Sequence, residues 1–282
     1  MQMKEIQYSD GALSKVATFS ASDPTAVTFV CLPAMGVRAS YYQLFANHLR
    51  MKGFNVITAD WRGQGHSSVR ASRTTDFGYE RIVADVKELM VYADEWFPNT
   101  KKVIIGHSLG GQIGSLLAAR YPELTTGLIL VTSGSVYHKA WDQSTALKLR
   151  LAGVALYPIS RVIGYFPGIK IGFGGKEART VMKDWCYTAL HGKYKLAYST
   201  YDYEQSLQEL SKPILSISVE NDYLASKLAV ENLYRKFNTT SSIEHVHLSS
   251  NETNIEPLTH FSWAKQPSYF ANLVTNWTRQ NV

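Results

Sequence analysis

Short apolar runs alternate with helical patterns through the first half of the chain. Four continuous apolar runs have the length of buried strands: residues 26–32, 54–59, 102–105 and 127–133. Apolar residues at helical spacing predict helices between them, over residues 40–51, 79–97 and 111–120. Strands and helices in alternation, joined by short loops, predict an α/β protein with right-handed crossovers and a mostly parallel central sheet flanked by helices.

Both ends of the chain add elements to this pattern. Residues 4–8 and 13–20 predict a hairpin, because Asp10-Gly11 between them favours the positive φ angles of a tight turn. We expect the hairpin strands at the edge of the sheet. Further strands are predicted at residues 213–219 and 243–248, and further helices at about residues 225–237 and 267–279.

The interval between Gly134 and residue 211 interrupts the alternation. It is too long for a crossover and too rich in tyrosine, tryptophan and phenylalanine for a linker. We therefore predict a core domain of residues 1–133 and 212–282, and a helical cap (lid) of residues 134–211. The aromatic residues either form an apolar lid over a site or serve as the cap's own small core.

A pentapeptide, Gly106-His107-Ser108-Leu109-Gly110, stands between the third of the apolar runs and the helix that follows it. A Gly-x-Ser-x-Gly sequence at such a junction holds the serine in a strained conformation at the sheet edge, and glycines are needed beside it. The unpaired N–H groups of the helix start would face whatever Ser108 attacks. The alternative is a glycine-rich helix start that Ser108 merely caps.

A nucleophilic serine needs a histidine base and a carboxylate that orients it. Asp222 follows the strand predicted at residues 213–219, and His260 lies in the loop after the last strand. In a parallel sheet these positions share the edge that carries Ser108. Glu220 competes with Asp222 as the acid.

Two backbone N–H groups are expected to bind the oxyanion, one from Leu109 and one from Met35 in the loop Pro33-Ala34-Met35-Gly36. We further expect His107, Met35, Tyr137 and Trp141 to line the substrate pocket. No metal site is expected, since no His, Cys or carboxylate cluster has metal-ligand spacing, and no cofactor is expected.

Composition limits the partners. The chain has 282 residues, 45% hydrophobic and 18% charged, as an ordinary globular protein has. The net charge of +6 is scattered, which argues against nucleic-acid binding, and two cysteines with no leader pattern suggest a cytoplasmic protein. No transmembrane segment is predicted. The apolar segment Leu149–Phe173 contains Arg150, Arg161 and Lys170, as an interfacial helix would, so peripheral membrane contact is an alternative. Pro158 and several glycines should, however, break this segment into short pieces.

The sequence resembles an α/β-hydrolase over nearly the whole chain. The matching pieces are the pentapeptide around Ser108, the loop Asp60-Trp61-Arg62-Gly63-Gln64-Gly65-His66-Ser67, Asp222 and His260. Three further pieces resemble an uncharacterised bacterial branch of predicted hydrolases: Pro33-Ala34-Met35-Gly36, Gly164-Tyr165-Phe166-Pro167-Gly168 and the Trp185-Cys186 stretch. The chain is similar, more distantly, to the monoacylglycerol lipase and serine aminopeptidase-like group. Most relatives carry His-Gly where this chain has Pro33-Ala34, a departure that bears on the second oxyanion donor.

The predicted function is that of a serine hydrolase that cleaves a carboxylic ester through an acyl-enzyme, with a small-molecule acyl ester or thioester as its substrate. A thioesterase or acyltransferase would use the same triad. The hypothesis from another class is a binding protein of this fold that holds a ligand without turnover. The sequence predicts no oligomeric state.

Overall fold

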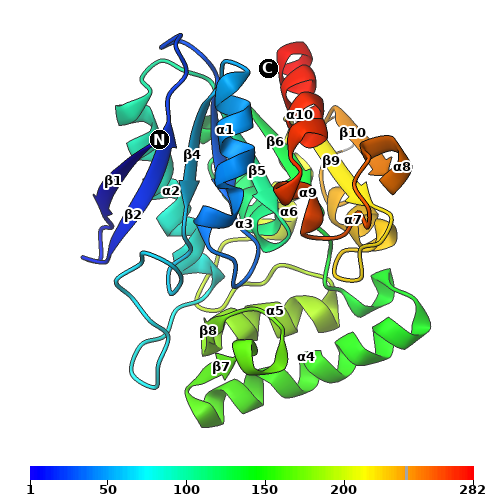
Figure 1. Cartoon of the computed structure of the whole chain (residues 1–282). Coiled ribbons are helices and arrows are strands. Elements are labelled where there is room, and N and C mark those ends of the chain that lie inside the picture. Colours follow the sequence, from blue (N-terminus) through cyan, green and yellow to red (C-terminus); the bar gives the residue numbers. More distant parts are fainter. Residues whose placement is uncertain (239–240) are drawn as a thin grey trace.

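An eight-stranded sheet forms the centre of the molecule (Figure 1), in a computed structural model that describes residues 1–238 and 241–282. The strand order is β1-β2-β4-β3-β5-β6-β9-β10. The strands are β1 (Gln2–Gln7), β2 (Leu13–Phe19), β3 (Thr28–Leu32), β4 (Asn55–Ala59), β5 (Lys102–His107), β6 (Gly127–Val131), β9 (Ile214–Val219) and β10 (Ile243–Leu248).

The sheet is parallel from β4 to β10 and antiparallel only where β1 and β2 join it. The expectation of a hairpin is confirmed. The expectation that both hairpin strands lie at the edge is wrong for β2, which pairs with β4 as well as with β1. The parallel register, for example Cys31 opposite Ile105, aligns the carboxyl ends of β3 and β5, so their following loops meet.

Helices cover both faces of the sheet. They are α1 (Gln43–Met51), α2 (Tyr79–Trp96), α3 (Leu109–Arg120), α7 (Lys227–Tyr234), α8 (Ser250–Thr253), α9 (Ser262–Lys265) and α10 (Ser268–Asn281), with 3-10 turns η1 (Ala39–Tyr42) and η2 (Pro122–Leu124). Side chains of β3 alternate between two cores: Val30 packs with α2 and α3, and Phe29 packs with α1 and α10. Burial on both faces explains why the central strands read as continuous apolar runs.

Most of residues 134–211 form a separate layer along one edge of the sheet (Figure 1), and we call the segment the 134–211 layer. The elements are η3 (His138–Ala140), α4 (Gln143–Ile163), β7 (Tyr165–Pro167), η4 (Gly168–Ile171), β8 (Lys176–Ala178), α5 (Arg179–His191) and α6 (Tyr203–Glu209). Helices α4 and α5 pack against each other, whereas α6 packs against α3. The small antiparallel hairpin of β7 and β8 is not indicated by the sequence pattern.

Helix α4 runs without interruption through Pro158, contrary to the expectation that this proline breaks the segment. Proline removes one backbone hydrogen bond, which Val154 would accept, and both residues are exposed to solvent that can replace it. The helix ends at Gly164, whose φ of 97° is left-handed. No helix among residues 1–238 and 241–282 is long and apolar enough to cross a membrane.

Candidate active site

Ser108 lies in a sharp turn between the last residue of β5 and the first residue of α3. Its φ of 53° and ψ of −118° are strained for a residue with a side chain. The flanking glycines permit this turn because the backbone packs closely around it. A Cβ on Gly106 would lie 2.3 Å from Gly111 Cα, and one on Gly110 would lie 2.1 Å from the carbonyl oxygen of Leu32.

His260 and Asp222 form a buried pair. His260 Nδ1 lies 2.8 Å from Asp222 Oδ2, and both side chains are almost completely enclosed. The other carboxylate oxygen of Asp222 accepts the N–H groups of Leu224 and Ala225, each at 2.8 Å. These bonds fix the carboxylate, and a proton on Nδ1 leaves the Nε2 lone pair of His260 free to act as a base.

Ser108 and His260 line the same pocket. Among the described residues no hydrogen bond joins the serine hydroxyl to the histidine, a separation that apo sites commonly show. Glu220, the competing acid, is exposed and accepts the backbone N–H of Ser250 instead of contacting His260. That hydrogen bonding with Ser250 lowers the pKa of Glu220.

The loop after β3 brings Met35 to this pocket. The N–H of Ala34 donates to the Tyr42 hydroxyl at 3.0 Å, and the indole N–H of Trp61 donates to the carbonyl of Pro33 at 2.8 Å. Within the described part of the chain no acceptor is recorded for the N–H of Met35. Leu109 is the first residue of α3, so its N–H has no partner within the helix.

His107 does not line the pocket. It is fully buried, with its ring centroid 4.7 Å from that of His260 and its Nδ1 2.6 Å from the Tyr42 hydroxyl. Burial, together with the neighbouring His260, holds the pKa of His107 well below its usual value of 6.5. His107 is therefore a neutral imidazole packed against the ring of His260.

Tyr137 and Trp141 do not line the pocket either, contrary to expectation. The ring of Tyr137 packs against Gly192, where a Cβ would come within 2.7 Å of it. The indole N–H of Trp141 donates to the carbonyl of Ser135 at 3.1 Å. Both residues hold the start of the 134–211 layer in place, a structural role that aromatic content alone does not reveal.

The pocket has a volume of about 120 Å³ and mostly apolar walls. Its walls include several residues that sequence reasoning did not select: Gln112, Val136, Phe173, Trp185, Leu224 and Phe261. Phe173 and Trp185 come from the 134–211 layer and belong to the aromatic set noted in the sequence. The others could not be found from the pattern, because they reach the pocket from α3 and from loops far apart in the chain.

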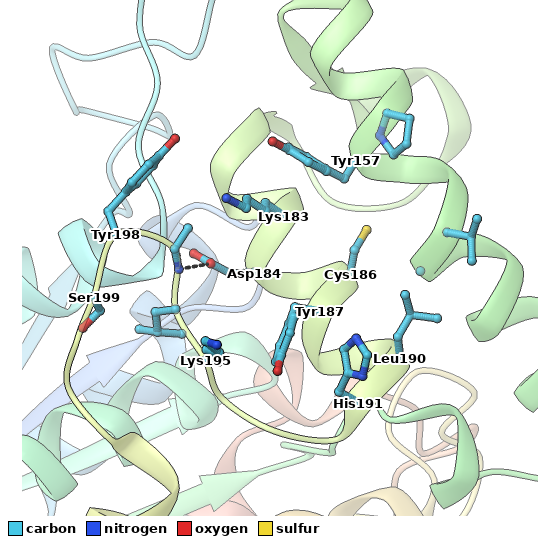
Figure 2. A pocket seen from close by; sticks show the side chains of 15 residues that line it. Tyr157, Lys183, Asp184, Cys186, Tyr187, Leu190, His191, Lys195, Tyr198 and Ser199 are labelled. Atoms are coloured by element: carbon cyan, nitrogen blue, oxygen red, sulfur yellow. Dashed lines mark hydrogen bonds between the residues drawn. The ribbon is translucent and has the colours of Figure 1, made fainter.

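A larger cavity of about 630 Å³ lies between α4, α5 and residues 195–199 (Figure 2). Burial raises the pKa of Asp184 there to about 7 and the pKa of Cys186 to about 11. Asp184 accepts the N–H of Ala197 at 2.7 Å, as the dashed line in Figure 2 marks. A thiol with a raised pKa is a poor nucleophile, so volume alone does not make this cavity the reactive site.

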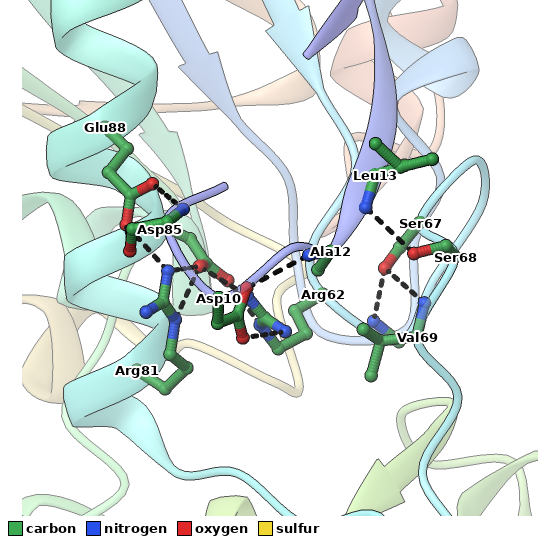
Figure 3. Close-up of polar contacts among 12 residues, drawn as sticks. Asp10, Ala12, Leu13, Arg62, Ser67, Ser68, Val69, Arg81, Asp85 and Glu88 are labelled. Atoms are coloured by element: carbon green, nitrogen blue, oxygen red, sulfur yellow. Dashed lines mark hydrogen bonds and ion pairs between the residues drawn. The ribbon is translucent and has the colours of Figure 1, made fainter. Parts of the chain in front are cut away.

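The loop Asp60–Ser67, which follows β4, has a structural role that supports the site. Its Arg62 forms two hydrogen bonds with Asp85 on α2, at 2.7 and 2.8 Å, and also pairs with Asp10 of the hairpin turn (Figure 3). Trp61 of the same loop holds Pro33. No cluster of three or more His, Cys, Asp or Glu side chains in the described ranges could hold a metal ion.

Comparison with known proteins agrees with this fold. A family model of the alpha/beta hydrolase fold matches residues 27–153. A monoglyceride lipase homolog of Monkeypox virus is 30% identical over 109 residues, which are 39% of this chain and only 38% of the viral protein. A putative carbamate hydrolase RutD of Agrobacterium fabrum is 22% identical over 72% of this chain and 78% of its own length.

Among solved structures, a hydrolase from Pseudomonas aeruginosa PA01 superposes with a TM-score of 0.64 at 18% identity, covering 98% of each chain. At that identity the likeness concerns the fold. The sheet order, the turn at Ser108 and the family match point to the same architecture. The chain therefore has the α/β-hydrolase fold, and over residues 27–153 it resembles that family and, within it, the monoacylglycerol lipases.

Proposed function

We propose that this protein is a serine hydrolase that cleaves carboxylic esters through an acyl-enzyme. Ser108 is the nucleophile, His260 is the base and then the acid, and Asp222 orients His260. The observation that carries the proposal is the 2.8 Å bond from His260 Nδ1 to Asp222, in the pocket that also holds the strained Ser108.

In the first half of the reaction His260 Nε2 takes the hydroxyl proton as Ser108 Oγ attacks the acyl carbon. The negative charge on the carbonyl oxygen is stabilised by the N–H groups of Met35 and Leu109, each contributing about 3 kcal/mol. His260 then returns the proton to the departing alcohol. In the second half a water molecule, deprotonated by His260, releases the acid and restores Ser108.

The walls of the pocket support a small, apolar acyl group as the part of the substrate that binds beside Ser108. A volume of about 120 Å³ is well below the roughly 300–1,000 Å³ of a site for drug-sized ligands. Phe173 and Trp185 narrow the pocket, which is why we also propose that residues 134–211 act as a cap over the core domain of residues 1–133 and 212–282. The names of the relatives, lipase and hydrolase, agree with this reaction class.

The test is a time course with p-nitrophenyl esters from acetate to dodecanoate, and with the matching acyl-CoA thioesters. We expect the fastest turnover with the shortest acyl chains, and a loss of several orders of magnitude in Ser108→Ala. Unchanged turnover in that variant would remove Ser108 from the role of nucleophile. A folded wild type that neither turns over nor reacts with a serine-directed phosphonate would favour the ligand-binding alternative.

The assignment of the acid is tested by a matched pair of substitutions. Asp222→Asn should lower kcat by about 10³–10⁴-fold, because the amide no longer selects the productive tautomer of His260. Glu220→Gln, at an exposed carboxylate two residues away, should leave kcat within about 3-fold. The opposite ranking would transfer the role to Glu220.

A further inference from the structure

Helix α4 turns an apolar face to solvent. Leu147, Leu151, Val154 and Val162 are 59%, 61%, 62% and 75% exposed, and Pro158 between them is exposed as well. Their spacing of three or four residues places them on one side of the helix. The opposite side packs against α5, where a Cβ on Gly153 would meet Leu190. In Figure 1, α4 forms the outer border of the 134–211 layer, beyond α5.

Two more exposed apolar side chains follow the helix in the chain. Ile169 and Ile171 in η4 are 75% and 61% exposed. We call these seven residues the outer cap surface: Leu147, Leu151, Val154, Pro158, Val162, Ile169 and Ile171. Clustered exposure of this kind is uncommon on a protein that meets only water, and it marks a surface that binds a partner.

The charged residues within residues 143–176, the stretch that carries the outer cap surface, are all basic. Helical geometry places Lys148 on one side of the α4 stripe and Arg150 and Arg161 on the other, all exposed, and Lys170 stands between the two isoleucines. From residue 143 to residue 176 the sequence contains no aspartate or glutamate. An apolar stripe with basic residues beside it is complementary to a surface that is apolar inside and anionic outside.

We propose that the outer cap surface docks on an anionic lipid bilayer, with its leucine, valine and isoleucine side chains in the interfacial region and its four cations at the phosphates. A second copy of this chain fits less well, because a two-fold contact through this surface would place the same cations against one another. The uninterrupted helix through Pro158 makes the surface continuous along α4.

Docking there would bring the pocket of Ser108 close to the membrane. Gly172 and Phe173 follow Ile171 directly in the chain and line the pocket. An apolar ester dissolved in the bilayer would thus reach the pocket from the side that the membrane covers. The binding itself does not depend on turnover, so it is measurable in Ser108→Ala.

The experiment is co-sedimentation of the full chain, with Ser108→Ala in parallel, with vesicles of phosphatidylcholine alone or with about 30% phosphatidylglycerol. We expect binding to the anionic vesicles that weakens strongly at about 0.5 M NaCl. Leu151→Gln/Val162→Gln should lower the partition coefficient at least about ten-fold, whereas the control Leu228→Gln, at an equally exposed leucine on α7, should not.

A second matched pair separates local from overall charge. Arg150→Gln/Arg161→Gln and Arg38→Gln/Arg235→Gln each remove two exposed positive charges, and only the first should lower binding, by roughly ten-fold. Equal effects of the two pairs, equal binding to neutral vesicles, or no binding at all would overturn the proposal. It would also be overturned by a dimer in sedimentation velocity that Leu151→Gln/Val162→Gln abolishes, since the surface would then be covered by a second copy.

Discussion

Tyr42 connects the loop of the proposed oxyanion site to His107, the histidine that packs against the proposed base His260. Its hydroxyl oxygen accepts the N–H of Ala34 at 3.0 Å, and the same hydroxyl lies 2.6 Å from Nδ1 of His107. Burial keeps His107 neutral, so its Nδ1 can accept the tyrosine proton. A single hydroxyl group therefore joins the loop that carries Met35 to the imidazole that packs against His260.

Removing this hydroxyl in Tyr42→Phe should lower kcat about ten-fold with little change in KM, because the Met35 N–H would lose its alignment in the transition state. Kinetics with p-nitrophenyl acetate measure both constants. Tyr92→Phe is the control, since the Tyr92 hydroxyl donates to the carbonyl of Gln7 at an exposed site. An equal loss in both variants, or a rise in KM alone, would contradict the positioning role.

His107 also makes stability depend on pH. Its folded pKa lies well below 6.5, so the unfolded chain binds a proton below pH 6.5 that the folded chain does not. Stability from this group is therefore complete above pH 6.5 and is lost as pH falls below it, by up to about 1.4 kcal/mol per pH unit. Urea unfolding of wild type and His107→Asn between pH 5 and 7.5 should show the shallower slope in the variant. Parallel slopes of stability against pH in the two proteins would show that His107 does not cause the pH dependence.

At the scale of residues, sequence reasoning selected Ser108, Asp222 and His260, and the structure brings all three to one edge of the sheet. These follow from rules that link chain position to sheet edge. The pocket walls did not follow, because Phe173, Trp185 and Phe261 meet only through packing between distant segments. Tyr137 and Trp141 show that aromatic character does not distinguish a pocket wall from a packing contact.

The junction of β5 and α3 depends on close approach between backbones. Gly110→Ala would place a Cβ 2.1 Å from the Leu32 carbonyl oxygen and 2.8 Å from that of Pro33. Neither atom can rotate away, so we expect a loss of at least about 3 kcal/mol of unfolding free energy. Chemical denaturation measures it. In the control Gly11→Ala the Cβ meets open space, and only the φ of 82° should cost about 1–2 kcal/mol. Similar losses in both would show that packing at Gly110 is unimportant.

Elements of the core were predictable because burial leaves a recognisable pattern of apolar residues in the sequence. The strands buried on both faces read as continuous apolar runs, and the helices as apolar stripes. The rule fails where local sequence is ambiguous. The three-residue strands β7 and β8 are too short to show a period, and Pro158 reads as a helix breaker although its surroundings tolerate it.

For the molecule as a whole, Arg62 connects the N-terminal hairpin, the loop after β4 and helix α2. Its partner Asp85 is buried, and burial raises the pKa of that carboxyl although two arginines lie beside it. Arg62→Ala would leave the buried carboxyl of Asp85 without its main partner, which should lower the free energy of unfolding by about 3–5 kcal/mol. Arg235→Ala, which breaks an exposed pair with Glu231, should change it by less than about 1 kcal/mol. Urea denaturation measures the free energy of unfolding of both variants, and equal values would contradict this prediction.

The 134–211 layer leaves the sheet after β6 and returns at β9, and these two strands are hydrogen-bonded neighbours. Helix α6, packed on α3, completes the crossover between them. The groups proposed for bond cleavage all lie outside this interval, whereas Phe173 and Trp185 lie within it. If the proposed function holds, mutation in the single stretch of the gene that encodes residues 134–211 can alter which molecules are accepted, while the two stretches that flank it keep the groups that cut them.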